Sequence, residues 1–229
     1  VLDSDALGQC LISGASYVLV DLKVTAPKGG HSGNDIVDPT REHATKLIAD
    51  LVSEMPQGVF YSENNQVITS CNLGGITSGN LDITNVINTE GRATYSIRSS
   101  NKQKENDLIA LMQETANAFN KQYAGIATAE ITFTEKMPMF EKNDDEFMPN
   151  LFSKVAREIG IEPEISSFHA GAETHIYANR TNANGEKFSP YLLGLATVCN
   201  MHSAREYVDY KTMLKGQELL KALFLEFNK

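Results

Sequence analysis

The sequence has no tryptophan and contains only three cysteines among its 229 residues. Cys10, Cys71 and Cys199 lie far apart and form no Cys-x-x-Cys pair. This spacing argues against a thiolate zinc site and against a disulfide framework. Proteins without disulfides are typical of reducing compartments, so we expect a cytoplasmic protein.

Long apolar runs and an excess of basic charge are also missing. No apolar segment approaches the roughly 20 residues of a membrane-spanning helix, and no signal peptide is recognisable. The formal net charge is -9 and the isoelectric point is about 5.1, whereas nucleic-acid-binding proteins usually carry a basic surface. Hydrophobic residues make up 41% and charged residues 21%, which is typical of a globular protein. We therefore expect neither a membrane nor a nucleic acid as a partner.

The middle of the chain has the pattern of a small α+β domain. Strands are predicted where apolar and polar residues alternate, at 17–26, 67–73, 85–99 and 129–135. Helices are predicted over 38–55, with Asp38 as N-cap, and over 106–124. The side chains expected to face the sheet are Ala44, Leu47, Ile48, Leu51, Leu108, Leu111, Met112, Thr115 and Phe119. This β-α-β-β-α-β order predicts a ferredoxin-like domain over residues 17–136, with a four-stranded antiparallel sheet and two helices on one face.

The remaining residues alternate helices and strands in the manner of an α/β layer structure. Helices are predicted at 146–160, 174–178 and 210–227, and strands at 164–168 and 191–196. Residues 1–16 and 137–229 are expected to be parts of one α/β domain into which residues 17–136 are inserted. Because the chain begins with Val1 rather than methionine, we also expect further sequence upstream.

Several polar residues lie where sites are commonly built, in turns and at strand ends. His31 lies in Gly-Gly-His-Ser-Gly, where flanking glycines permit a close approach and the imidazole could donate a hydrogen bond to a developing oxyanion. His202, after an apolar strand, could bind a metal, and so could Asp3, for which Asp5 is a competitor. Each also has an ordinary interpretation as a solvated or turn residue. His43, within a predicted helix, is interpreted as an ordinary helical residue.

Asn85 and Arg98 flank the third predicted strand. An arginine can bind a carboxylate through two hydrogen bonds, and an asparagine amide can orient a carbonyl group. A solvated arginine at a strand end is the ordinary alternative. Neither residue indicates a site by itself.

Six motifs in sequence order resemble those of the di-zinc aminopeptidase, dipeptidase and aminoacylase family, which includes peptidase T and Xaa-His dipeptidase. They are VLDSDALGQ (1–9), KVTAPKGGHSG (23–33), CNLGGITSGNLDITNVIN (71–88), RATYSIRS (92–99), FHAGAET (168–174) and NMHSAREYV (200–208). Gly-Gly-His-Ser-Gly alone would not be specific. The six motifs together, in this order over almost the whole chain, are specific for the family.

The resemblance implies a zinc-dependent exopeptidase that hydrolyses di- or tripeptides through a water bound by two zinc ions. It implies that Asp3 and His202 are terminal ligands, one on each zinc ion, and that His31 is a catalytic residue that stabilises the oxyanion. The family's first histidine ligand, its bridging aspartate and its general-base glutamate correspond to no residue of this chain. The 229 residues alone are therefore expected to be an inactive fragment.

The resemblance also implies substrate contacts and a partner. Asn85 and Arg98 would bind the carboxylate end of the peptide, and Glu173 is a candidate for binding its amino group. Family members often pair through the inserted domain, so a homodimer through residues 17–136 is expected, with an open sheet edge as a reasonable contact. The sequence leaves open whether His31 acts in its own chain or in a partner. Departures from the family pattern are Asp5, Asn88, Ser96 and the polar segment 179–190.

Two other functions stay open at this point. The first is an amidohydrolase of the same family that removes an acyl group from an amino acid. The second is a non-catalytic fragment or dimerisation module. The departures listed above bear on substrate preference more than on the fold.

Overall fold

The computed structural model describes residues 1–142 and 145–229, and these form two compact units. One unit is Ser16–Met137, and the other combines Val1–Ala15 with Pro138–Lys229. Each unit has its own buried hydrophobic core. The mixture of α/β structure with an α+β unit confirms the fold class expected from the sequence. Among the described residues, no helix is both long and apolar enough to span a membrane.

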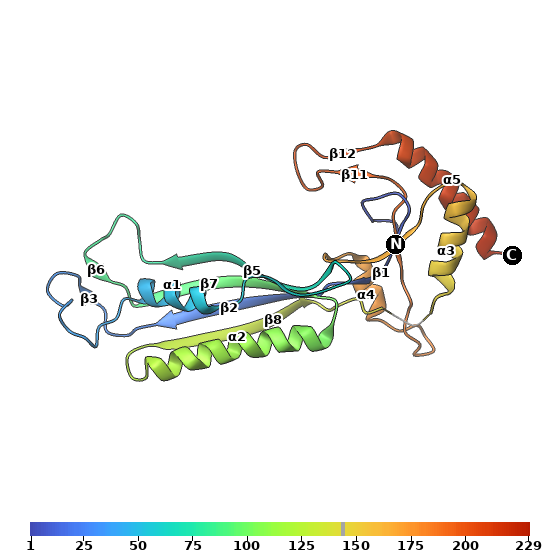
Figure 1. Ribbon diagram of the computed structural model, residues 1–229. Coiled ribbons are helices and arrows are strands. Elements are labelled where there is room, and N and C mark those ends of the chain that lie inside the picture. Colours follow the sequence, from blue (N-terminus) through green and yellow to red (C-terminus); the bar gives the residue numbers. More distant parts are fainter. Residues whose placement is uncertain (143–144) are drawn as a thin grey trace. The chain divides into compact units, whose positions relative to one another are not determined.

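The unit Ser16–Met137 is built on a five-stranded antiparallel sheet (Figure 1). Its strands are β2 (Tyr17–Thr25), β4 (Gly58–Glu63), β5 (Gln66–Ser78), β7 (Glu90–Ser99) and β8 (Thr128–Met137), in the spatial order β4-β5-β7-β2-β8. The last four have the ferredoxin-like order. The predicted number of four strands was wrong, because β4 forms a hairpin with β5 and extends one edge of the sheet. The first three residues of β4 are all exposed, so its sequence lacks the apolar-polar alternation that reveals a half-buried strand.

Two helices, α1 (Ala44–Glu54) and α2 (Lys102–Gln122), cover one face of this sheet. Strand β2 presents Val18, Val20, Leu22 and Val24 to the core, as expected for a strand with one buried face. The four predicted side chains of α1 are buried. In α2, the predicted residues Leu108, Met112 and Phe119 are buried, and so is Ala116. The prediction was wrong for Leu111, which is exposed, and Thr115 is only partly buried.

Helix α1 begins later than predicted. Asp38 is not its N-cap, because the Asp38 Oδ1 atom accepts hydrogen bonds from Thr40 N at 3.0 Å and Thr40 Oγ1 at 2.7 Å. These bonds, together with Arg41, hold the pKa of the Asp38 carboxyl below its usual value. The N-cap is instead His43, which is therefore not a mid-helix residue, and Ala44 N donates to the carbonyl of Asn88 at 2.9 Å. A local turn thus competes successfully with the helix.

The second unit contains a small mixed sheet of order β10-β1-β9. Its elements are β1 (Gln9–Gly14), α3 (Phe147–Glu158), β9 (Glu164–Phe168), α4 (Glu173–Ala178), β10 (Leu192–Leu193), the hairpin β11 (Val198–Cys199) and β12 (Tyr207–Val208), and α5 (Tyr210–Phe227). The three helices lie where the sequence predicts them, whereas the strand predicted at 191–196 is only two residues long and β1 was not predicted. Helices α3 and α5 pack together (Figure 1), with Phe152, Val155, Leu219 and Leu223 in the core.

Candidate functional site

Two loops at one end of the five-stranded sheet carry His31 and Asn85. The short strands β3 (Gly30–His31) and β6 (Val86–Ile87) pair antiparallel, with His31 opposite Val86 (Figure 1). The Ser32 N–H donates to the carbonyl of Asn85 at 3.0 Å. The structure therefore brings two of the predicted site residues together, although they are far apart in the sequence.

The imidazole of His31 is exposed and its orientation is fixed by backbone groups. Its Nδ1 atom accepts hydrogen bonds from Gly33 N at 3.1 Å and from Asn34 N at 3.3 Å. The backbone N–H of His31 donates to Asp35 Oδ2 at 2.8 Å. Because Nδ1 is an acceptor, the neutral ring carries its proton on Nε2. The ring thus offers an N–H donor with a fixed direction. Asp35 and the turn after His31 fix this direction, and the residue His31 alone does not reveal it in the sequence.

Arg98 lies elsewhere in the same unit. It is eight residues beyond Glu90 at the other end of β7, roughly 25 Å along the strand at about 3.3 Å per residue. Its Cζ atom is 5.0 Å from the centre of the Tyr17 ring, and its buried Nη1 has no hydrogen-bond partner among the described residues. Within one chain, the structure does not bring Arg98 together with His31 and Asn85.

Asp3 and His202 both belong to the second unit. The carbonyl of Asp5 accepts a hydrogen bond from Val198 N at 2.9 Å, so the N-terminal segment lies beside the start of β11. His202 is in the loop that joins β11 to β12. Both side chains are exposed, and they project from neighbouring segments of one unit.

The backbone of His202 has an unusual conformation. Its φ angle is 61°, in the left-handed region, and that of Asn200 is 56°. The His202 N–H donates to Glu206 Oε2 at 2.7 Å, and Ser203 Oγ donates to the carbonyl of Asn200 at 2.7 Å. Left-handed conformations of residues other than glycine are costly and are found preferentially at functional sites. Glu206 therefore fixes the position of His202 through its backbone.

An aspartate and a histidine are donor types that zinc accepts. Catalytic zinc sites take at least three protein ligands. Within residues 1–142 and 145–229, no group of three or more histidine, cysteine, aspartate or glutamate side chains is arranged to hold a metal ion. The described residues thus have suitable donor chemistry but do not complete a zinc site by themselves.

Glu173 is exposed and is the first residue of α4. Burial lowers the pKa of the Val1 amino group, and the Glu173 carboxylate partly offsets this shift. Glu173 is therefore close to the N-terminal segment that carries Asp3.

His175, although it follows the His-Ala-Gly-Ala-Glu turn, is a core residue of the second unit. It is fully buried, with Nε2 3.0 Å from the carbonyl of Ala15 and Nδ1 accepting from Ala172 N at 3.2 Å. The rings of Phe168 and Phe140 lie edge-on to it, with centroids 5.4 and 6.0 Å away. His175 therefore connects the residue after β1 to the start of α4, which is a structural role.

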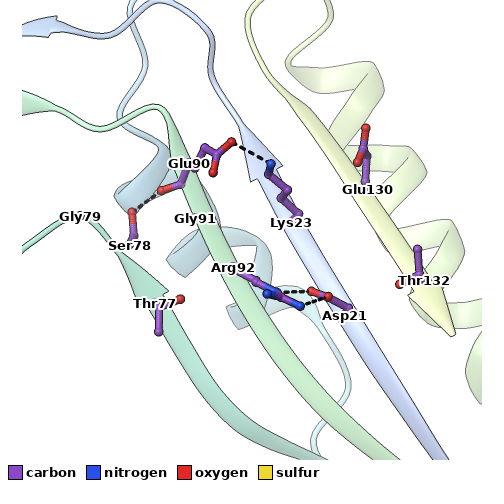
Figure 2. Close-up of a pocket in the computed structure, with 10 residues that line it drawn as sticks. All are labelled: Asp21, Lys23, Thr77, Ser78, Gly79, Glu90, Gly91, Arg92, Glu130 and Thr132. Carbon is purple, nitrogen blue, oxygen red and sulfur yellow. Dashed lines mark hydrogen bonds and ion pairs between the residues drawn. The ribbon is translucent and has the colours of Figure 1, made fainter. Parts of the chain in front are cut away.

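A shallow cavity of about 450 Å³ lies on the other face of the five-stranded sheet, away from the helices (Figure 2). Four of its charged side chains form two ion pairs. Lys23 Nζ is 2.7 Å from Glu90 Oε1, and Arg92 binds Asp21 through two hydrogen bonds. These partners raise the pKa of Lys23 and of Arg92. No predicted site residue lines this cavity, and exposed ion pairs of this kind stabilise a fold only weakly.

Residues 20–124 match the family model described as a peptidase dimerisation domain of the M20 type. Residues 20–124 are a peptidase dimerisation domain of the M20 type. This match confirms the family predicted from the sequence. The matched segment includes His31, Asn85 and Arg98, whereas Asp3 and His202 lie outside the M20 dimerisation domain. No curated protein sequence matches the chain.

Solved structures with the M20 fold resemble the whole chain. Aminopeptidase PepT from Bacillus cereus has a TM-score of 0.81 and 21% identity, covering 100% of this chain and 56% of its own. A tripeptidase from Staphylococcus aureus has a TM-score of 0.78 and 20% identity, covering 100% and 58%. A dinuclear metal-binding M20 peptidase from Bacillus subtilis has a TM-score of 0.64 and 12% identity, covering 95% and 52%. The chain thus spans just over half the length of these proteins.

Proposed function

We propose that the protein is a zinc-dependent exopeptidase that hydrolyses di- or tripeptides in the cytoplasm. The observation that carries this proposal is the fixed imidazole of His31, with Nδ1 occupied by two backbone N–H groups and Nε2–H left as the donor. Its neighbour Asn85 adds an amide on the adjacent loop. The fold shared with an aminopeptidase and a tripeptidase supports the same class of reaction.

In this proposal the His31 Nε2–H donates to the oxygen of the scissile carbonyl as negative charge develops on it. A donor that is already oriented needs no reorganisation during the reaction, and one such hydrogen bond typically contributes about 100- to 1,000-fold to kcat. Asn85 orients the same part of the peptide. Nε2–H is the donor in this proposal, because Nδ1 accepts hydrogen bonds from two backbone N–H groups.

Asp3 and His202 would hold metal in the second unit. Zinc, when bound, supplies an activated water as the nucleophile. The other ligands and the general base would come from sequence outside these 229 residues, so that this chain is the substrate-binding part of a longer enzyme. Glu173, exposed beside the N-terminal segment, would bind the amino group of the peptide.

The separation of Arg98 from His31 also supports a dimer. An extended tripeptide spans only about 10 Å, at about 3.5 Å per residue, whereas Arg98 lies roughly 25 Å along β7 from Glu90, which closely follows β6 in the sequence. We therefore infer that His31 and Arg98 of one chain do not bind the same small peptide. We propose that the peptide contacts His31 and Asn85 of one copy and Arg98 of a second copy.

Peptide hydrolysis by the complete protein, with and without zinc, tests the proposal. We expect metal-dependent cleavage of di- or tripeptides and a loss of about 100-fold or more in kcat for His31→Ala. His43→Ala is the matched control, because the His43 side chain makes no capping hydrogen bond and lies at the start of α1 rather than in the β3–β6 pair. Cleavage of N-acyl amino acids instead of peptides would identify an amidohydrolase. No cleavage of either class would leave a non-catalytic dimerisation module.

A further inference from the structure

Exposed apolar side chains gather on the two loops that carry His31 and Asn85. Within Ser16–Met137, half of the large apolar side chains that are exposed lie on these loops. They are Ile36, Val37, Leu81, Ile83 and Val86, of which Leu81 is 99% and Val37 84% exposed. Single exposed apolar residues are ordinary, but a group of them beside polar functional residues indicates a contact surface.

Val86 is the member of this group whose position relative to His31 is defined by strand pairing. The two residues are direct partners in the β3–β6 ladder. Side chains of directly opposed residues point to the same face of a ladder, with Cβ atoms about 5 Å apart. Ile87, the next residue, points to the opposite face and is buried, whereas Val86 is 45% exposed. The isopropyl group of Val86 therefore lies alongside the imidazole.

Hydrogen bonds outside the ladder hold this arrangement in place. Arg41 Nη1 donates to the carbonyl of Gly29, just before β3. Asn88 Nδ2, just after β6, donates to Thr45 Oγ1 at 2.8 Å. Both strands are thus tied at their outer ends, so the position of Val86 beside His31 does not depend on two short strands alone.

We propose that Val86 is a specificity-determining residue that contacts an apolar side chain of the peptide next to the cleaved bond. This inference rests on the proposed function, because the group that binds the scissile carbonyl is His31. A peptide residue that carries leucine, methionine or phenylalanine at this place buries apolar surface against Val86, and a glycine does not. One methyl group removed from such a contact corresponds to roughly a fourfold change in kcat/KM.

Val86→Thr tests the inference, because threonine keeps the size and the β-branch but replaces one methyl group with a hydroxyl. The matched control is Val59→Thr, at an exposed valine on the edge strand β4. The kcat/KM of the complete protein is measured for Leu-Gly-Gly, Gly-Leu-Gly and Gly-Gly-Gly. We expect Val86→Thr to lower the value for one leucine peptide about 4- to 10-fold relative to Gly-Gly-Gly, and Val59→Thr to leave the ratio unchanged.

Other outcomes overturn the inference in distinguishable ways. An equal effect of Val86→Thr on all three peptides would show that Val86 does not contact the leucine side chain. An equal loss accompanied by dissociation in sedimentation velocity would show that this surface contacts another subunit. Hydrolysis of no peptide by the unaltered protein would reject the proposed function and the inference together.

Discussion

The hydroxyl group of Tyr95 leads to a prediction about stability. Tyr95 lies on β7 and is 2% exposed, in the core between the sheet and its two helices. Its hydroxyl is buried and has no hydrogen-bond partner among the described residues. A buried donor without a partner loses the hydrogen bonds it makes to water in the unfolded chain, at a cost of about 1–3 kcal/mol.

Tyr95→Phe removes this hydroxyl and keeps the ring. We expect it to raise the free energy of unfolding by about 1–3 kcal/mol at pH 7, measured by urea unfolding followed by circular dichroism. Tyr61→Phe is the control, because Tyr61 is only partly buried on the edge strand β4, and its ring contact with Lys104 is retained. Destabilisation by Tyr95→Phe would refute the reasoning, since it would show that the hydroxyl has a partner.

The stability difference between Tyr95→Phe and the unaltered protein should also depend on pH in the alkaline range. Burial, followed by the charge of Cys71, raises the pKa of Tyr95 to about 12 from a usual value of 10.0. A raised folded-state pKa means that the neutral group stabilises the fold below pH 10 and that this contribution is lost as the pH rises through about 12. The stability advantage of Tyr95→Phe should therefore widen by about 1.4 kcal/mol between pH 7 and pH 11. An advantage that stays constant or shrinks contradicts this assignment.

Three further predictions concern other parts of the chain. A Cβ atom on Gly14 would lie 2.6 Å from His175 Cε1, so Gly14→Ala should lower the free energy of unfolding by about 1–3 kcal/mol and with it the melting temperature. An unchanged melting temperature would contradict this packing. His202→Gly should abolish metal binding in the complete protein, measured by metal analysis, without lowering the thermal stability of the metal-free protein, because glycine accepts the left-handed backbone; retained metal would reject His202 as a ligand. Burial raises the pKa of Cys10 to about 12 and that of Cys71 to about 11, so both thiols should resist alkylation at pH 8 until urea unfolds the protein, and rapid labelling of either thiol would refute their burial.

Much of the fold could be predicted because its elements have strong periodic patterns. The alternation in β2 and β7 and the apolar face of α1 identified the ferredoxin-like unit. The start of α1 could not be predicted, because the choice between an N-cap and a local turn at Asp38 depends on Thr40 and Arg41. Strand β4 was missed for a related reason, since an exposed edge strand gains its pairing from β5 rather than from its own pattern.

The sequence suggests candidate site residues but not how they are arranged in space. The pairing of β3 with β6, which places His31 beside Asn85 and Val86, involves only two residues on each strand and has no periodic signal. Arg98 is far from these residues because it lies near the opposite end of the long strand β7. His175 follows a glycine-containing turn, and its burial against two aromatic rings shows that its role is structural.

The most direct test of the account is the rate of tripeptide hydrolysis by the complete protein, with zinc and after removal of zinc by a chelator, for the unaltered enzyme and for His31→Ala. We predict cleavage that is lost with the chelator, restored by added zinc, and reduced about 100-fold or more in kcat by His31→Ala while zinc content stays the same. Metal-independent cleavage, or full activity of His31→Ala, would contradict it.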